Sequence, residues 1–437
     1  MLLFPAGSAP NEGWRSFLSN RLLLLAWLGL IGIEIAFNGI IAFERVNHPQ
    51  LALNLREDDS LATVSRVQEL VEIRTRVALA AAQGKAAPPD ASNGVAAELL
   101  RAQMERALAR EPLAPNGIGT LGQLQERSAA RAYMKAALAI NKSNQAALLW
   151  QIDDDLRESR HTAALENLDL LFRANPATLP GMSVVLVALL AKPASEDATR
   201  NLLMTNPPWL GQALALALPQ ISSPGSAARL FADLRRASVP VDPRLLGLYA
   251  WKILNAGKVA ESYDFWRSQL TAPQSAKLAN LYNGDFSLPS GGSPFDWATN
   301  SVKGVSISFV GMNDGKPYTA LRLRYGPGQA APHSVSQFWR LAPGSYRFSG
   351  ELSGELRNPR GQIWRVVCAF GGHQSVIGQS TPILGSRNGW AGFEFNIKVP
   401  QSDCPLQQVQ LFLDGRTASE MLASGEILYK FLQLKSD

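Results

Sequence analysis

The character of the sequence changes at "NGDFSLPSGGSPFDW" (283–297), and this change requires two kinds of structure in one chain. Upstream, residues 59–282 are rich in Ala, Leu, Arg, Glu and Gln, and their apolar positions recur at intervals of three and four. This spacing predicts amphipathic helices. Downstream, Gly, Ser and Pro separate short alternating segments, which predict β-strands. We therefore expect a helical domain at 44–282 and a sheet domain at 283–437.

Composition limits the classes of protein to be considered. Of the 437 residues, 46% are hydrophobic and 18% are charged, a balance typical of folded domains. The formal net charge is +6, and the basic residues are scattered among acidic ones. A nucleic-acid-binding protein would carry a basic patch or stripe instead, so we exclude nucleic acid as a partner.

The N-terminal region contains a segment suited to a membrane. Residues 22–43 include one charged side chain, and as a helix they would be about 33 Å long, close to the roughly 30 Å of a bilayer's hydrocarbon core. The segment is longer than the apolar stretch of a typical cleaved signal peptide. We predict a single transmembrane signal anchor at 22–43, preceded by a cytoplasmic tail at 1–21.

Two polar residues interrupt this predicted anchor. Glu34 and Asn38 are four residues apart and share one face of a helix, while Gly29 and Gly32 would let another helix approach closely. Because a carboxylate inside a bilayer usually pairs with another group, we expect a membrane protein partner or a homo-oligomer at this face. The alternative is that Glu34 is protonated and tolerated by a strongly apolar anchor.

Orientation and compartment depend on separate signals. Arginines flank the predicted anchor almost equally, so the positive-inside rule is nearly balanced. They are Arg15 and Arg21 before it and Arg45 and Arg56 after it. The two cysteines, Cys368 and Cys404, form either a disulfide in an oxidising compartment or two buried free thiols. Behind a signal anchor the disulfide is favoured, so we place the bulk of the chain in the periplasm, at a bacterial inner membrane.

Helix ends are predicted where Pro and Gly gather, because these residues terminate helices. Four such breaks divide the helical region, at 84–94, 111–119, 173–181 and 238–244. Helices of ordinary globular length joined by short links are therefore expected to form antiparallel pairs.

Part of the helical region repeats itself. "ALAINKSN" (137–144) and "LFRANPAT" (171–178) align at a separation of 34 residues. Ala130 and Ala164 occupy a small-residue position in the two units, and Pro176 is a terminal proline. The pattern resembles the tetratricopeptide repeat (TPR). This resemblance implies a TPR-like solenoid whose surface binds a protein partner.

Three consecutive acids, Asp153, Asp154 and Asp155, lie within a predicted helix. Consecutive residues on a helix point in three different directions, so these carboxylates are not arranged to converge on a metal ion. We interpret the run as a solvated helix face.

Eight strands are predicted in the sheet domain, at 303–310, 318–326, 335–341, 345–353, 363–370, 391–399, 407–413 and 425–434. Eight short strands in about 150 residues fit a two-sheet jelly roll. The predicted fold is therefore a single N-terminal transmembrane helix, a TPR-like α-solenoid and a C-terminal β-sandwich jelly roll.

Three stretches of the sheet domain carry a family resemblance. They are N-G-D-F followed by P-F-D-W, then "LAPGSYRFSGEL" (341–352), and finally "GEILYKFLQLK" (425–435). They resemble jelly-roll carbohydrate-binding modules, which commonly open with N-x-x-F, carry a Pro-Gly-x-Tyr turn and close on an F-D-x-V-x-L strand. The resemblance implies binding of a polysaccharide. Lys430 and Phe431 stand where the closing motif often carries an acidic residue, so we predict no calcium or other metal and no cofactor.

Alternation separates core from surface on four of the predicted strands. One phase is apolar and predicts the core between two sheets: Tyr346, Phe348, Leu352, Trp364, Val366, Cys368, Phe370, Phe393, Phe395, Ile397, Val409, Leu411 and Leu413. The opposite phase carries groups that hydrogen-bond sugar hydroxyls, provided that the strands are neighbours. The predicted carbohydrate-binding residues are Arg347, Glu351, Arg365, Trp390, Glu394, Asn396, Gln408 and Gln410, with Trp390 at a strand start as a stacking surface. The alternative is an ordinary solvated sheet face.

No catalytic signature accompanies these residues. The four histidines stand alone without metal-ligand spacing, and no nucleophile-elbow, Walker or dinucleotide motif occurs. A glycosidase would need two facing carboxylates, such as Glu351 and Glu394. We expect instead a non-enzymatic, membrane-anchored periplasmic scaffold that binds a protein partner and a glycan, in envelope or exopolysaccharide assembly or export. The alternative is a structural subunit of an inner-membrane complex whose jelly roll makes only protein contacts.

Overall fold

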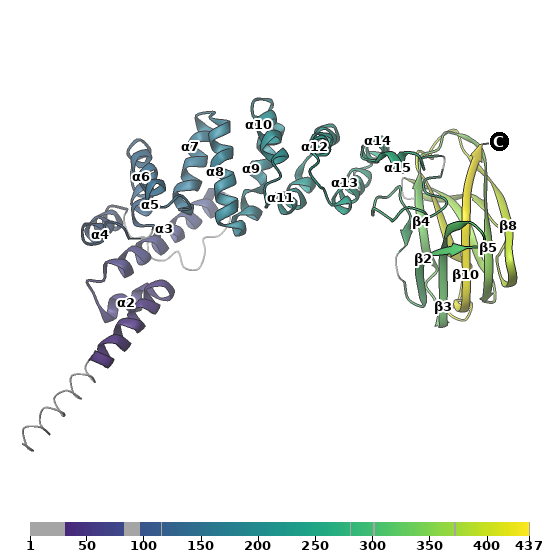
Figure 1. Cartoon of the computed structure of the whole chain (residues 1–437), viewed down its shortest axis with the longest axis horizontal. Helices are drawn as coiled ribbons and strands as arrows, with labels where there is room; N and C mark the ends of the chain where they lie inside the picture. The colour runs from purple at the N-terminus through teal and green to yellow at the C-terminus, as the bar shows by residue number, and fades with distance from the viewer. Residues whose placement is uncertain are drawn as a thin grey trace, which may run out of the picture. The chain divides into compact units, whose positions relative to one another are not determined.

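Figure 1 shows a computed structural model of the chain, which describes residues 31–82, 97–114, 116–279, 281–299, 302–370 and 373–436. These residues are helical up to α15 and then form strands, as the change in composition predicts. The chain divides into two compact units, Met1–Pro176 and Ala177–Asp437. The predicted tail at 1–21, residue Gly29 and the predicted break at 84–94 lie outside the described residues.

The helices of the first unit end close to the predicted positions. Residues 31–47 are helical and are followed by α2 (Pro49–Leu55), α3 (Ser60–Ala82), α4 (Ala97–Arg110), α5 (Gly117–Gln123), α6 (Arg127–Ile140), α7 (Gln145–Arg157) and α8 (His161–Ala174). The ends of α4 and α8 fall at the predicted breaks 111–119 and 173–181. Helix α5 packs against α6, and α7 packs against α8, so neighbours in sequence form pairs.

Helices α6 and α8 repeat one another at the predicted period. Each has 14 residues, and each ends at an asparagine, Asn141 or Asn175, with φ of −139° and −142° respectively. Ala130 in α6 and Ala164 in α8 are buried at equivalent positions. The 34-residue period is therefore present in the structure, while its assignment to the tetratricopeptide family stays a prediction.

Two of the three consecutive acids do not lie on the solvated face that we predicted, while Asp153 is 50% exposed. The side chains of Asp154 and Asp155 are 0% and 2% exposed. Three arginines surround Asp154: Arg127 and Arg131 of α6 and Arg160 before α8. The nearest guanidinium nitrogen of each lies 2.9 to 3.2 Å from a carboxylate oxygen of Asp154. The prediction failed because periodicity within α7 does not reveal the arginines that packing brings from α6 and α8.

The C-terminal part of the predicted anchor packs within the first unit. Ile41, in the helix at 31–47, is fully buried together with Ala52 of α2 and Ala62 of α3. Among the described residues, no single helix is long and apolar enough to cross a membrane. Helix α8 and residues 176–191 meet the requirement of length and composition only when the two are taken together.

Helices also open the second unit. They are η2 (Pro176–Thr178), α9 (Leu179–Ala191), α10 (Pro193–Met204), α11 (Leu210–Ala217), η3 (Leu218–Gln220), α12 (Pro224–Arg236), α13 (Pro243–Asn255), α14 (Val259–Ser268) and α15 (Ala272–Ser275). The predicted break at 238–244 separates α12 from α13. Ser223 and Asp242 cap these two helices by accepting hydrogen bonds from backbone N–H groups, and a proline follows each cap, where its missing N–H costs nothing.

The strands form an antiparallel β-sandwich, as predicted (Figure 1). They are β1 (Ala298–Thr299), β2 (Val305–Asn313), β3 (Pro317–Gln329), β4 (His333–Trp339), β5 (Gly344–Arg357), β6 (Gln362–Phe370), β7 (His373–Gln379), β8 (Gly385–Val399), β9 (Gln407–Leu413) and β10 (Leu422–Ser436). Sheet A has the order β1-β4-β9-β6-β7, and sheet B has the order β2-β3-β10-β5-β8. The edge strands β1 and β7 escaped prediction because they are short or polar.

The core lies between the two sheets. Every predicted core residue whose side chain is described lies in it or packs against it. Trp364 is fully buried near its centre, with its ring 5.3 Å from that of Tyr429 and 5.5 Å from that of Phe348. The buried amide of Gln362 accepts from Tyr429 at 2.8 Å and donates to Tyr325 at 2.6 Å. The Gln362 amide is therefore satisfied, whereas the buried indole nitrogen of Trp364 has no hydrogen-bond partner among the described residues.

The predicted disulfide is confirmed. Cys368 on β6 is bonded to Cys404 in the segment between β8 and β9, and both residues are buried. The alternative of two free thiols is excluded, because neither cysteine is free.

Candidate functional site

The eight predicted carbohydrate-binding residues lie on two faces and not on one. Five belong to β5 and β8 of sheet B, namely Arg347, Glu351, Trp390, Glu394 and Asn396. Three belong to β6 and β9 of sheet A, namely Arg365, Gln408 and Gln410. Alternation identifies side chains that point outward, but it does not reveal which strands are neighbours. The single predicted site is wrong because β5 and β6, although consecutive in sequence, enter opposite sheets.

On sheet A, the predicted side chains bind one another. The Nη2 group of Arg365 donates to Gln410 Oε1 at 3.1 Å, and Gln410 Nε2 donates to Gln408 Oε1 at 2.8 Å. The guanidinium of Arg365 lies 4.3 Å from the centre of the Phe412 ring, and burial lowers the pKa of Arg365. Part of the hydrogen-bonding capacity of this face is therefore used within it, and Arg365 Nε is buried without a partner in the described part of the chain.

On sheet B, exposed polar residues line the outer face of β5 and β8. Arg347 pairs with Asn396 in the β5–β8 register, and Arg347 Nη1 lies 3.9 Å from Glu394 Oε2. All three side chains are exposed. This part of the predicted face is therefore available to a ligand.

An aromatic cluster occupies the same face. It consists of Tyr318 from β3, Trp390 from β8 and Phe431 from β10, and we call it the aromatic platform. The Tyr318 ring centre lies 5.9 Å from that of Trp390 and 5.7 Å from that of Phe431. We predicted that Trp390 lies at a strand start, but it lies inside β8. Phe431 is 39% exposed.

Lys430 holds the platform together from within the sheet. Its Nζ lies 4.1 Å from the ring centre of Trp390, 4.5 Å from that of Tyr318 and 5.1 Å from that of Phe431. The same Nζ lies 3.3 Å from Glu351 Oε2, and Lys430 is buried. A cation surrounded by aromatic rings attracts each of them, so the three rings are fixed relative to one another.

Asp314, in the turn between β2 and β3, ties the platform together at a second point. Tyr318 donates its hydroxyl hydrogen to Asp314 Oδ2 at 2.5 Å, and Trp390 Nε1 donates to the same oxygen at 3.3 Å. The hydrogen bond from Tyr318 lowers the pKa of Asp314. Residues from opposite edges of sheet B therefore meet over its outer face.

A β-bulge places Phe431 on the platform. The register between β10 and β5 shifts between Lys430 and Gln433, and Phe431 has a φ of +51°, which is strained for a bulky side chain. The bulge lets Lys430 and Phe431 both face outward while Leu432 returns to the core. Gly350 makes room for this, since a Cβ there would lie 2.5 Å from Leu432 Cδ2.

Sequence reasoning missed Tyr318, Lys430 and Phe431 as members of a binding face. Lys430 and Phe431 appeared only as a departure from a family motif. The usable signal was the break in alternation at 430–431, because two consecutive non-core side chains within a strand indicate a bulge. Backbone strain in a bulky residue also points to a functional site.

The residues predicted to contact a membrane partner lie partly within the described helix at 31–47. Asn38 Oδ1 accepts a hydrogen bond from Arg56 Nη2 at 3.1 Å, so the structure supplies an intrachain partner that the sequence did not indicate. Glu34 and Gly32 are exposed, and a Cβ at Gly32 would meet no atom within 4 Å. Their predicted role in the membrane stays a prediction.

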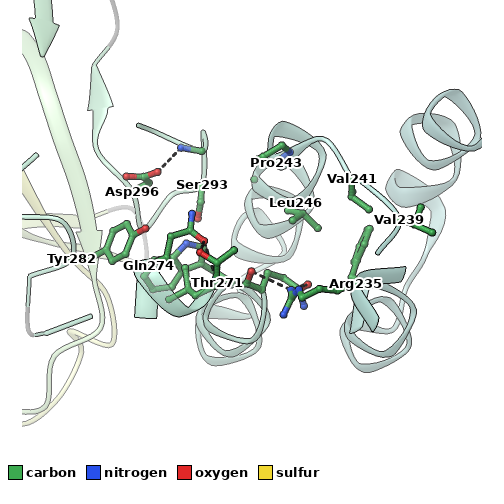
Figure 2. A pocket seen from close by; sticks show the side chains of 16 residues that line it. Arg235, Val239, Val241, Pro243, Leu246, Thr271, Gln274, Tyr282, Ser293 and Asp296 are labelled. Atoms are coloured by element: carbon green, nitrogen blue, oxygen red, sulfur yellow. Dashed lines mark hydrogen bonds between the residues drawn. The ribbon is translucent and has the colours of Figure 1, made fainter. Parts of the chain in front are cut away.

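A pocket of about 230 Å³ lies in the second unit, outside the sheet faces (Figure 2). Its walls come from helices α12 to α15 and from the segment that leads into the sandwich. Figure 2 shows Tyr282, Ser293 and Asp296 at one end and Arg235 and Val239 at the other. Asp296 is 4% exposed, and it accepts hydrogen bonds from the backbone N–H groups of Gly291 at 2.5 Å and Trp297 at 2.8 Å.

Burial raises the pKa of Asp296, and this predicts how stability depends on pH. A carboxyl whose pKa is raised by folding stabilises the protein fully below its unfolded pKa of about 4, and this contribution is lost as pH rises through the folded pKa. We expect the stability of the wild type relative to Asp296→Asn to fall as pH rises from 3 to 7, because asparagine does not titrate and offers one acceptor oxygen at every pH. Thermal unfolding across this range measures the difference, with the exposed Asp264→Asn as control. A difference in stability between the wild type and Asp296→Asn that stays the same at every pH would contradict this expectation.

Comparisons with known proteins find solved structures that are similar to part of the chain. No protein-family model and no curated protein matches the chain. One of the similar structures is a family 4 carbohydrate-binding module with 14% sequence identity and a TM-score of 0.27, and the match covers 36% of this chain and 99% of that chain. Another is a family 61 module in complex with β-1,4-galactotriose, with 17% identity and a TM-score of 0.21, and the match covers 37% of this chain and 98% of that chain. A β-1,3-glucan-binding family 6 module from Bacillus halodurans is also similar, with 9% identity and a TM-score of 0.21, and the match covers 32% of this chain and 96% of that chain.

Proposed function

We propose that this protein is a non-enzymatic, membrane-anchored scaffold that binds a glycan through the aromatic platform of sheet B. The observation that carries the proposal is the cluster of Tyr318, Trp390 and Phe431 beside exposed guanidinium, carboxylate and amide groups on one sheet face. Aromatic rings offer flat apolar surfaces for sugar rings, and neighbouring polar side chains hydrogen-bond their hydroxyls. A polysaccharide strand is therefore the ligand that matches this face.

The rigidity of the platform supports the same proposal. The ammonium of Lys430 and the carboxylate of Asp314 hold the rings in place before any ligand arrives. Binding to a preorganised surface loses little side-chain entropy. The strained backbone of Phe431 is the kind of local cost that persists at functional sites.

The wider role rests on three further observations. A buried disulfide is typical of an oxidising compartment and supports a periplasmic location. Paired helices with a 34-residue period support binding of a protein partner. The apolar segment 22–43 supports membrane anchoring. A scaffold of this kind would raise the effective concentration of glycan beside its partner, as envelope or exopolysaccharide assembly or export requires.

The proposal predicts a large loss of glycan binding on removal of one platform ring. In the full-length chain, Trp390→Ala is expected to weaken binding to the source cell's envelope polysaccharides by about 2 kcal/mol, or roughly 30-fold, because the ring is a central contact. Phe431→Ala is expected to act in the same direction. Affinity electrophoresis against purified polysaccharide fractions measures both changes.

Two substitutions on opposite sheets assign the binding face. Asn396→Ala, on sheet B, is expected to weaken binding, whereas Arg365→Ala, on sheet A, is expected to leave it unchanged. Equal losses from Trp390→Ala and Arg365→Ala would disprove the assignment to sheet B. Absence of binding to every fraction would make the sandwich a protein-contact domain, and the chain a structural subunit of a membrane complex.

A further inference from the structure

The pocket in Figure 2 shares no residue with the aromatic platform, and glycan binding does not account for it. Its walls are held rigidly. Trp251 Nε1 on α13 donates to the carbonyl oxygen of Gly292 at 3.1 Å. A Cβ at Gly247 would lie 2.8 Å from the backbone of Gly292, so α13 touches this turn directly. The pocket is therefore preformed, as small-molecule sites usually are.

The carboxylate of Asp296 is an uncompensated charge in this pocket. Within the described part of the chain, no lysine, arginine or histidine forms an ion pair with it, and its two hydrogen-bond donors are backbone N–H groups. Burying an unpaired charge is costly. Each carboxylate oxygen accepts one of these hydrogen bonds, Oδ2 from Gly291 and Oδ1 from Trp297, so each keeps a further lone pair for a ligand.

Aromatic side chains surround this end of the pocket. Trp266 and Tyr282 are both buried lining residues, and their ring centres lie 5.1 Å apart at an interplanar angle of 90°. Burial and the nearby charge of Asp296 raise the pKa of Tyr282 to about 12, so the phenol stays neutral. A pocket that combines a carboxylate with aromatic walls is suited to organic ammonium ions.

The rest of the pocket is mainly apolar. Its lining includes Phe231, Val239, Val241, Leu246 and Leu270. Arg235 lines the opposite end, where its Nη2 group donates to the carbonyl oxygen and to Oε1 of Gln269, at 3.1 Å and 2.9 Å. These partners are neutral and leave the positive charge of Arg235 in place, but Arg235 lies at the end of the pocket away from Asp296 (Figure 2). The charge preference at the Asp296 end is therefore set by Asp296.

We propose that this pocket is a second ligand site, which takes a small molecule carrying a protonated amine on a compact apolar body. The amine N–H groups donate to Asp296 beside Trp266 and Tyr282, and the apolar body lies against α12 and α13. The ligand supplies the cationic partner that Asp296 does not have among the described residues. The proposal is independent of glycan binding, so either one can fail alone.

Matched probes test the charge preference. Binding of phenethylamine, its uncharged analogue 2-phenylethanol and the anion phenylacetate to the full-length chain is measured by ligand-observed NMR titration. We expect the amine to bind at least about tenfold more tightly than the alcohol, and the anion to bind most weakly. Asp296→Asn removes the charge and keeps an acceptor for one of the two backbone N–H groups. In this variant the ratio between amine and alcohol is expected to fall to about one.

Two control variants complete the test. Asp264→Asn removes an exposed carboxylate on α14 outside the pocket and is expected to keep the wild-type ratio. Leu246→Trp fills the pocket and is expected to abolish binding of both probes. The proposal is overturned if the alcohol binds as tightly as the amine to the wild type, if Asp296→Asn keeps the preference, or if neither probe binds at millimolar concentration.

Discussion

Asp154→Ala is expected to lower the free energy of unfolding of the first unit by about 3 kcal/mol, because it breaks a buried ion-pair network. Burial raises the pKa of Asp154, but hydrogen bonds from Arg131 and Arg160 and the charge of Arg127 outweigh that effect and leave the pKa below its ordinary value. The carboxylate is therefore held ionised where it is fully buried. Urea-induced unfolding followed by circular dichroism measures the loss.

The adjacent aspartate is a matched control. The Asp153 side chain is 50% exposed, and Asp153→Ala is expected to cost less than about 1 kcal/mol, as surface ion pairs usually do. A group whose folded pKa is depressed stabilises the protein above its unfolded pKa, and this contribution is lost as pH falls through the folded value. The gap between wild type and Asp154→Ala should thus close below about pH 3.8. Similar costs for both substitutions at neutral pH would show that the network contributes no stability.

Loss of the disulfide is expected to have an effect of comparable size in the second unit. Cys368 and Cys404 are 36 residues apart, and in the chain-entropy model a loop of this length is worth about 4 kcal/mol. The double substitution Cys368→Ala and Cys404→Ala should lower the free energy of unfolding by that amount. The measurement is urea-induced unfolding followed by tryptophan fluorescence, since Trp297, Trp339 and Trp364 all lie in the sandwich core.

Reduction supplies the control for this second prediction. Dithiothreitol should destabilise the wild type as much as the double substitution does, and it should leave the double variant unchanged. If the free energy of unfolding falls by less than about 1 kcal/mol in both experiments, the stability of the sandwich comes from the packing of its sheets and not from the crosslink.

Local patterns predicted most of the fold. Pro and Gly marked the ends of α4, α8 and α12, because their backbone restrictions act within a few residues. Alternation identified the core of β5, β6, β8 and β9, because inward and outward positions on a strand follow directly from its period of two. The disulfide was favoured over two free thiols because the cysteines follow a predicted signal anchor, and the structure contains it.

The site was less predictable, because its members meet through pairing between distant strands. Trp390, Glu351 and Asn396 were named from their outward phase, yet Tyr318 and Phe431 complete the platform from strands far away in sequence. Arg365 was assigned to the same face and lies on the other sheet. Alternation carries no information about which strand lies beside which. This is why residues from two different sheet faces were assigned to one binding face.

The sequence by itself determined the order of helices and strands and the interior of the sandwich, because each depends on spacing along the chain. Only the tertiary structure decided which charges are buried, which rings gather on sheet B and where a pocket remains. Asp154 and Asp296 illustrate the difference, since one is buried among three arginines and the other has no cationic partner among the described residues. Partners in space are set by packing between segments far apart in sequence, which periodicity within one segment does not encode.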